Sequence, residues 1–251
     1  MRTWRRGLGA VASTAVAALV LAGCQTPTTP GEPPPCPYPE ATIQTNGDSL
    51  GLHLSRYLGY DLPEKTVVDR TEPRSGFTYA LDAIPSEGLP PVPTIADAAK
   101  QWMAECGTPE LLVIQGGIND LVGRGFSAEQ IAPALVELSD WLRDNDVPTL
   151  WIAVHPIAAA GNNLWIQPAR QALNEWMTSG VLWGDVADCG HSIEDPARPD
   201  TLDPAYYEIV DLFGSVDGVH PNQTGYEVFA GCISEAALDA IARRGAGESG
   251  G

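Results

Sequence analysis

The pattern of apolar and polar residues divides this chain into short strand-like runs that alternate with longer helix-like runs. The strand-like runs lie near residues 41–46, 66–70, 110–115, 149–154 and 181–186. The helix-like runs lie near residues 50–60, 94–105, 128–145, 164–178 and 222–242. This alternation predicts an α/β fold in which a mostly parallel five-stranded sheet is covered by helices on both faces, a three-layer α/β/α sandwich.

The first predicted strand departs from this pattern. Its residues Ile43-Gln44-Thr45-Asn46 are more polar than those of a central parallel strand, which is usually buried on both faces. The pattern therefore defines the ends of this strand poorly. With 251 residues and 44% hydrophobic content, the chain can bury one sizeable core, and we expect residues 41–242 to form a single domain.

Both ends of the chain are expected to lie outside this domain. Residues 1–23 have a basic start and an Ala/Val/Leu-rich run, which is typical of an export signal and too short for a membrane span. They lead into Leu21-Ala22-Gly23-Cys24, which resembles the lipobox of bacterial lipoproteins; the alternative is an ordinary signal with a coincidental cysteine. Residues 24–40 are a proline-rich tether, and residues 243–251 are expected to be a flexible tail. We therefore expect an exported protein, anchored to the outer face of the cell membrane by a lipidated Cys24.

Charge and missing motifs exclude several classes of function. The formal net charge is −18, which disfavours binding to nucleic acid and to anionic lipid surfaces. The sequence has no phosphate-binding loop, no dinucleotide fingerprint and no zinc-type cysteine spacing. We therefore expect no cofactor and no metal ion.

Three polar segments carry the candidate chemistry. Ser49 follows the first strand in a Gly-Asp-Ser-Leu turn that would lift its hydroxyl to the carboxyl edge of the sheet. Asp217 and His220 are three residues apart, so the carboxylate could reach one ring nitrogen and leave the other free for the Ser49 proton. Asn119 follows the third strand and two glycines, where its amide could donate to an oxyanion. Each segment alone also fits a helix cap or a simple turn, but together they indicate acyl transfer through a serine ester.

These segments resemble the sequence blocks of the SGNH hydrolases, also called the GDSL esterase/lipase family. Gly47-Asp48-Ser49-Leu50 matches the nucleophile block, Gly117-Ile118-Asn119-Asp120 the Gly-x-Asn-Asp block, and Asp217-x-x-His220 the last block. Ser75-Gly76 is a weaker match to the block whose glycine N–H binds the oxyanion. The resemblance spans about residues 41–241.

The resemblance implies the SGNH hydrolase fold, with a flavodoxin-like strand order, and a serine ester hydrolase without a cofactor. It implies that Ser49 is the nucleophile, that His220 is the general base and that Asp217 orients it. The oxyanion would be held by the N–H groups of Ser49 and Gly76 and by the side chain of Asn119. Asp120 is expected to make a turn or a hydrogen bond rather than to take part in the chemistry.

We therefore expect an acylesterase for short acyl esters, with O-acyl groups on envelope glycans as candidate substrates, acting as a monomer. Three alternatives stay open. An acyltransferase would pass the acyl group to a sugar hydroxyl rather than to water. A lipase or phospholipase would need a large apolar patch at the mouth, which the acidic segment 188–216 argues against. A non-catalytic surface-binding lipoprotein would not need the complete set of site residues.

Two longer loops, residues 156–163 and 188–216, are expected at the carboxyl edge, where ligands bind in folds of this kind. Solvated connectors are the alternative for both. From these loops and the end of the fourth strand we select candidate substrate-contacting residues, although a structural role is an equal or better alternative for His155. The candidates are His155, Tyr206, Tyr207 and Phe213.

If Cys24 is lipidated, four cysteines remain, which allow three disulfide pairings in an exported protein. Cys36 and Cys106 each precede a strand and should lie at the amino edge of the sheet. Cys189 follows the fifth strand at the opposite edge, so a Cys106–Cys189 bond is disfavoured. We favour Cys36–Cys106 with Cys189–Cys232, and the alternative pairs Cys36 with Cys232.

Overall fold

The computed structural model describes residues 36, 38, 42–51, 54–78, 92–159, 163–207 and 217–246. The predicted export signal, Cys24, most of the tether, Phe213 and the last residues of the tail lie outside the described residues.

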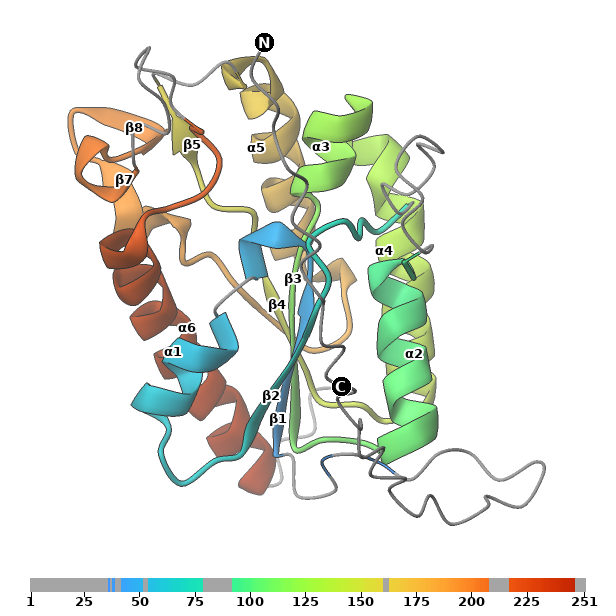
Figure 1. Ribbon diagram of the computed structural model, residues 1–251. Helices are drawn as coiled ribbons and strands as arrows, with labels where there is room; N and C mark the ends of the chain where they lie inside the picture. The colour runs from blue at the N-terminus through green and yellow to red at the C-terminus, as the bar shows by residue number, and fades with distance from the viewer. Residues whose placement is uncertain are drawn as a thin grey trace, which may run out of the picture. The chain divides into compact units, whose positions relative to one another are not determined.

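A five-stranded parallel sheet forms the centre of the domain (Figure 1). Its strand order is β2-β1-β3-β4-β6, and every neighbouring pair is parallel. The predicted α/β fold with a flavodoxin-like order is therefore confirmed. The strands are β1 (Ile43–Gly47), β2 (Val67–Thr71), β3 (Leu111–Gln115), β4 (Thr149–Ile152) and β6 (Asp185–Ala187).

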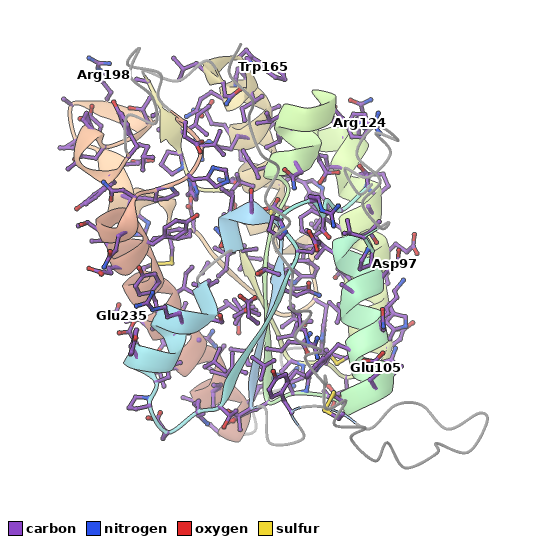
Figure 2. All side chains as sticks on the ribbon, viewed as in Figure 1. Asp97, Glu105, Arg124, Trp165, Arg198 and Glu235 are labelled. Atoms are coloured by element: carbon purple, nitrogen blue, oxygen red, sulfur yellow. A yellow bond between two sulfur atoms is a disulfide. The ribbon has the colours of Figure 1, made fainter. Side chains whose placement is uncertain are left out.

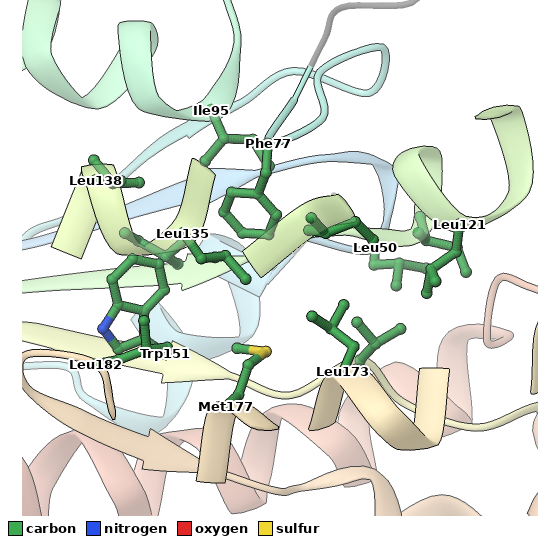
Figure 3. Close-up of a cluster of buried hydrophobic side chains, with 14 of the residues drawn as sticks. Leu50, Phe77, Ile95, Leu121, Leu135, Leu138, Trp151, Leu173, Met177 and Leu182 are labelled. Carbon is green, nitrogen blue, oxygen red and sulfur yellow. The ribbon is translucent and has the colours of Figure 1, made fainter. Parts of the chain in front are cut away.

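Helices cover both faces of this sheet. Side chains alternate along a strand, so Leu112 and Ile114 of β3 join one apolar cluster while Leu111 and Val113 join another. Figure 3 shows the first cluster, in which Trp151 lies among residues of the helices on that face. Figure 1 shows α1 and α6 on the other face. The helices are α1 (Leu54–Asp61), α2 (Ile95–Cys106), α3 (Ile118–Arg124), α4 (Ala128–Asp144), α5 (Gln167–Trp176) and α6 (Gln223–Gly245).

The polar strand β1 lies inside the sheet, between β2 and β3, and all five of its residues are buried. Hydrogen bonds compensate part of this burial. The Thr45 hydroxyl donates to Asp69 at 3.2 Å, and the Asn46 amide donates to the Ile95 carbonyl at 3.2 Å. The second bond also ties β1 to the start of α2, so the polar side chains fix a neighbouring helix.

The structure corrects the boundaries predicted for the last strand of this sheet. Residues 177–181 continue the helical segment, and β6 starts only at Asp185. Gly180, with φ of 83°, interrupts the helical backbone, and Gly184, with φ of 95°, turns the chain just before β6, and together they account for the difference. A Cβ at Gly184 would lie 2.3 Å from the Thr149 carbonyl oxygen, so the chain passes too close to β4 for any larger residue.

The segments predicted as two longer loops, residues 156–163 and 188–216, contribute strands to a second, small sheet. Its strands are β5 (Ile157–Ala158), β7 (Glu194–Asp195) and β8 (Arg198–Leu202), in the order β5-β8-β7. Two short helical turns flank it, η5 (Gly190–Ile193) and η6 (Pro204–Tyr206). The small sheet and its two flanking turns therefore form an ordered wall beyond the carboxyl ends of the main strands.

Two disulfides join distant parts of the chain, and the favoured pairing is confirmed. Cys36 pairs with Cys106, with Cα atoms 4.8 Å apart, and Cys189 pairs with Cys232, with Cα atoms 5.7 Å apart. The alternative Cys36–Cys232 bond is therefore wrong. A disulfide typically stabilises a domain by about 2–4 kcal/mol, largely through the unfolded chain.

No helix among the described residues is long and apolar enough to cross a membrane.

Candidate active site

The Gly-Asp-Ser-Leu segment forms a tight elbow at the carboxyl end of β1. A Cβ at Gly47 would lie 1.8 Å from the Gln115 carbonyl oxygen, so only glycine allows β1 to pass this closely over the end of β3. The backbone N–H of Asp48 donates to that same oxygen at 3.2 Å. Ser49 then starts the 3₁₀ turn η1 (Ser49–Gly51) and is half-buried. The elbow therefore presents the Ser49 hydroxyl at the carboxyl edge of the sheet.

His220 lies between Ser49 and Asp217. Its Nε2 is 2.9 Å from the Ser49 Oγ, and its Nδ1 is 2.7 Å from the Asp217 Oδ2. When Nδ1–H donates to the carboxylate, Nε2 is left to accept the serine proton. The structure thus brings together the three side chains that the sequence analysis selected as nucleophile, base and orienting acid.

The turn that carries Asp217 and His220 is held from several sides. The Asp217 Oδ1 accepts the backbone N–H groups of Val219 at 3.1 Å and His220 at 3.2 Å. Gly218 has φ of 71°, and its carbonyl accepts the N–H of Ala158 from β5 at 2.7 Å. The small second sheet therefore helps to place His220 over Ser49.

The charges of this pair shift both pKa values. The hydrogen bond that His220 donates to Asp217 is the main cause that raises the pKa of His220 above 6.5; burial opposes the rise, and the charges of Asp217 and Asp48 add to it. Partial burial raises the pKa of the Asp217 carboxyl, but the hydrogen bond and charge of His220 outweigh it and hold that pKa below its usual range. The pair therefore favours a negatively charged carboxylate beside a basic imidazole.

Asn119 lies on α3, a short helix that the sequence pattern does not predict. Gly117, in the left-handed region with φ of 106°, precedes this helix and lets the chain turn into it directly after β3. The Asn119 amide nitrogen lies 2.9 Å from the Pro73 carbonyl oxygen and 2.6 Å from that of Ser75. An amide nitrogen carries two hydrogens, and two carbonyls already accept from it.

The loop with Gly76 lies directly against this amide. A trans peptide points its C=O and its N–H in opposite directions. Because the Ser75 carbonyl faces Asn119, the N–H of Gly76 points away from the Asn119 amide. The two predicted oxyanion donors therefore lie next to each other but do not converge on one point in this arrangement, and their roles stay predictions.

Asp120 makes hydrogen bonds, as expected. It is buried and accepts the N–H groups of Phe77 at 2.8 Å and Thr78 at 2.9 Å, together with the Thr78 hydroxyl. Burial raises the pKa of this carboxyl, although these hydrogen bonds oppose the rise. Asp120 thereby ties α3 to the segment that follows Gly76.

Of the four predicted substrate-contacting residues, the three in the described part of the chain pack wholly or partly against the core. His155 has no exposed surface, and its ring packs edge-on against Phe229 of α6 with centroids 5.4 Å apart. Tyr206 and Tyr207 are half-buried and pack against the apolar cluster beneath α6. These positions favour the structural alternative for His155, and Phe213 lies outside the described residues.

Two residues at the carboxyl end of the sheet were not selected as candidate site residues from the sequence. Asp48, inside the Gly-Asp-Ser-Leu segment itself, is fully buried beside Ser49. Trp165 is 57% exposed, and its ring lies against Gly125, where a Cβ would be 3.6 Å from it. Figure 2 shows Trp165 and Arg198 at the same end of the domain. The sequence feature that could have indicated Trp165 is its position just after the loop of residues 156–163, which was expected at the carboxyl edge of the sheet.

Among the described residues, no group of three or more His, Cys, Asp or Glu side chains is arranged to hold a metal ion.

A family model and several solved structures match this chain, and they indicate the same family. The family model described as "GDSL-like Lipase/Acylhydrolase family" matches residues 46–228, which contain every site residue described above. A search of curated proteins found no match.

Solved structures share the fold at low sequence identity. A GDSL-like lipase from Bacteroides thetaiotaomicron is 14% identical with a TM-score of 0.57, over 81% of this chain and 90% of that chain. A carbohydrate acetylesterase family member from Sinorhizobium meliloti is 13% identical with a TM-score of 0.56, over 80% and 99%. A member of the lipolytic protein G-D-S-L family from Veillonella parvula is 14% identical with a TM-score of 0.51, over 78% and 97%. With the family match over most of its domain and the five-stranded sheet that these structures share, the chain belongs to the GDSL-like lipase/acylhydrolase family and is an SGNH hydrolase.

Proposed function

We propose that this hydrolase cleaves carboxylic esters through an acyl-enzyme on Ser49. One observation carries the proposal: His220 faces the Ser49 hydroxyl with one ring nitrogen, at 2.9 Å, and Asp217 with the other, at 2.7 Å. A hydroxyl, a base and an acid in hydrogen-bond contact are what serine acyl transfer needs.

In the acylation step, the Ser49 Oγ attacks the ester carbonyl while His220 Nε2 takes the hydroxyl proton. The carbonyl oxygen becomes an oxyanion, for which the N–H groups of Ser49 and Gly76 and the amide of Asn119 are the proposed donors. The bond to the alcohol oxygen then breaks, and His220 returns the proton to the departing alcohol. Ser49 is left as an acyl ester.

In the deacylation step, water takes the place of the alcohol. His220 removes one proton from the water as its oxygen attacks the acyl carbon. The bond to Ser49 breaks, the proton returns to the serine oxygen, and a carboxylic acid leaves. Asp217 stays ionised throughout and stabilises the imidazolium that forms twice in each cycle.

We propose short acyl esters on carbohydrate as the substrate class. The wall of β7 and β8 beyond the sheet carries Glu194, Asp195 and Asp200, which suits hydroxyl-rich ligands better than long alkyl chains. The exposed ring of Trp165 offers a flat apolar face of the kind on which a sugar ring can pack. The structurally similar protein from Sinorhizobium meliloti is described as a carbohydrate acetylesterase family member.

We propose that the protein is exported and held at the outer face of the cell membrane by a lipid on Cys24. The signal-like start and the sequence Leu21-Ala22-Gly23-Cys24 support this. The two disulfides support an oxidising compartment. Cys24→Ala should move the protein from the membrane fraction to the soluble exported fraction. An unchanged distribution would contradict the lipid anchor.

The activity is tested by release of p-nitrophenol from esters of increasing acyl length, with acetylated oligosaccharides as a second series. Ser49→Ala should lower turnover by about 10⁴–10⁶-fold and abolish labelling by a fluorophosphonate probe. Ser179→Ala, which changes an exposed serine on another element, is the matched control. Equal labelling of Ser49→Ala and wild type would overturn the assignment. A new ester in place of free acid would show a transferase, and a preference for long chains a lipase.

A further inference from the structure

The carboxylate of Asp48 links the two elements that carry the nucleophile and the side-chain oxyanion donor. Its side chain has no exposed surface. One oxygen, Oδ1, accepts the backbone N–H of Leu50 at 3.0 Å. The other, Oδ2, accepts the N–H groups of Gly117 at 2.9 Å and Ile118 at 3.1 Å. A single buried group therefore joins the elbow after β1 to the start of α3.

The residues that Asp48 holds are neighbours of the proposed chemistry. Leu50 directly follows Ser49, and Ile118 directly precedes Asn119. A shift of either segment would change the distance between the Ser49 Oγ and the Asn119 amide. We infer that Asp48 is a positioning residue for the proposed ester hydrolysis: its carboxylate sets the nucleophile and the Asn119 donor at a fixed separation. This inference rests on the proposed function.

A second buried carboxylate extends the same linkage. Asp120, on α3, accepts the N–H groups of Phe77 and Thr78, the residues that follow Gly76. Asp48 therefore ties the elbow to α3, and Asp120 ties α3 to the Gly76 segment. All three proposed oxyanion donors are thus placed relative to one another through two acids that contact no solvent.

Holding Asp48 in this position has an electrostatic cost. Burial raises the pKa of Asp48 to about 7, the charge of Asp120 adds to the rise, and the N–H groups that it accepts oppose it. If Asp48 only filled space, a neutral side chain of the same shape, such as asparagine, could replace it. Asparagine, however, has one acceptor oxygen and one donor nitrogen, so it cannot accept from both Leu50 and the start of α3. The contacts require a carboxylate.

The charge of Asp48 also reaches the general base. Among the described residues, the charge of Asp48 raises the pKa of His220 before α6 and of Tyr226 on α6, and the charge of Asp120 on α3 acts in turn on Asp48. For His220, the negative charge of Asp48 is one of several causes of the rise. When His220 accepts the Ser49 proton, an ionised Asp48 therefore stabilises the imidazolium in addition to Asp217. Loss of this charge should move the acid limb of the pH profile to lower pH.

The experiment compares Asp48→Asn, Asp48→Glu and wild type by steady-state kinetics against pH, with folding checked by circular dichroism. Asp48→Asn should lower kcat by about 10²–10³-fold, the effect of a lost oxyanion donor, with KM little changed and the acid limb at lower pH. Asp48→Glu keeps the charge but displaces the oxygens, so kcat should fall while the acid limb stays. A purely structural role would lower the melting temperature without moving the acid limb.

The outcomes separate the inference from the function on which it rests. A folded Asp48→Asn protein with wild-type kcat and an unmoved acid limb overturns the inference while hydrolysis by wild type still stands. If Asp48→Asn does not fold, Asp48→Glu decides, and normal kcat there overturns the inference. Wild-type protein that neither hydrolyses esters nor reacts with the fluorophosphonate at Ser49 overturns the proposed function instead.

Discussion

The Asn119 amide nitrogen lies 2.6 Å from the Ser75 carbonyl oxygen, so the peptide between Ser75 and Gly76 turns its N–H away from that amide. The groups on either side of this peptide are fixed. The Ser75 N–H donates to the Glu72 carbonyl at 2.9 Å, and the Gly76 carbonyl accepts the N–H of Ile95 at 3.1 Å. Rotation of the peptide plane between these anchors would turn the Gly76 N–H toward the Asn119 amide.

We therefore expect this peptide to rotate when an oxyanion forms. In a crystal structure of the Ser49 phosphonate adduct, the Gly76 N–H and the Asn119 amide should both contact the phosphonyl oxygen, and the Ser75–Asn119 hydrogen bond should be absent. A rotation of this kind changes φ of Gly76 widely, which glycine tolerates better than other residues. An adduct that keeps the Ser75–Asn119 bond would contradict this expectation.

Truncation of Asn119 should affect both catalysis and stability. Asn119→Ala removes one oxyanion donor, so kcat should fall by about 10²–10³-fold with KM little changed. It also removes the bonds to the Pro73 and Ser75 carbonyls, each worth about 0.5–1.5 kcal/mol of unfolding free energy. Kinetics and urea unfolding measure the two effects separately. A sharply higher KM with normal kcat would instead make Asn119 a substrate-binding residue.

Asn119→Asp is the matched variant. An aspartate has the same shape but places oxygen against the Pro73 and Ser75 carbonyls, so it should destabilise the domain more than alanine does. If the aspartate variant were as stable as wild type, the two carbonyl contacts would not hold the loop.

The acid limb of the activity profile should report His220. The base must be neutral to take the Ser49 proton, and its pKa in the folded protein is raised above 6.5, mainly by the hydrogen bond that it donates to Asp217. Activity should therefore fall as the pH drops through that raised value. Asp217→Asn should shift the acid limb to lower pH and also lower the maximal rate, because the ring loses its orienting partner. The measurement is kcat/KM against pH, and an unmoved acid limb with a near-normal rate would point to another carboxylate.

The α/β fold follows from alternation over long segments, and the Asp217–His220 pair follows from a local spacing of three residues. The strand order and the contact of His220 with Ser49, which lie far apart in sequence, were predicted from the family resemblance. Helix α3 was not predicted, since Gly116-Gly117 looks like a helix breaker. Gly117 in fact uses its positive φ to start the helix directly after β3. A glycine pair at a strand end is therefore compatible with a helix as well as with a loop.

The second sheet, and the hydrogen bonds of the Asn119 amide to the Pro73 and Ser75 carbonyls, depend on contacts between segments that are distant in sequence. β5 and β7 have two residues each, too few for a sequence pattern. β8 is tied to α5 by an ion pair between Arg170 and Asp200 at 3.3 Å. The Asn119 contacts likewise depend on the path of the Pro73–Ser75 turn, about 45 residues away in sequence. Residue types and spacings carry no information on such a path.

The buried His155 should make the stability of the domain depend on pH. Burial is the main cause that lowers its pKa to about 4, and its Nδ1 lies 2.8 Å from the Pro156 carbonyl oxygen. In the described structure Nε2 has no hydrogen-bond partner, so a proton there would be a buried charge without an acceptor.

In the unfolded chain the same ring titrates near 6.5. The unfolded state therefore binds this proton first as the pH falls, and the free energy of unfolding should drop by about 3 kcal/mol between pH 6.5 and 4. His155→Gln removes the proton-binding group, so its unfolding free energy from urea denaturation should fall less steeply over this range. His191→Gln, at an exposed position, is the control for loss of a histidine. An identical slope in His155→Gln and wild type would show that His155 titrates alike in both states and that its burial costs nothing on protonation.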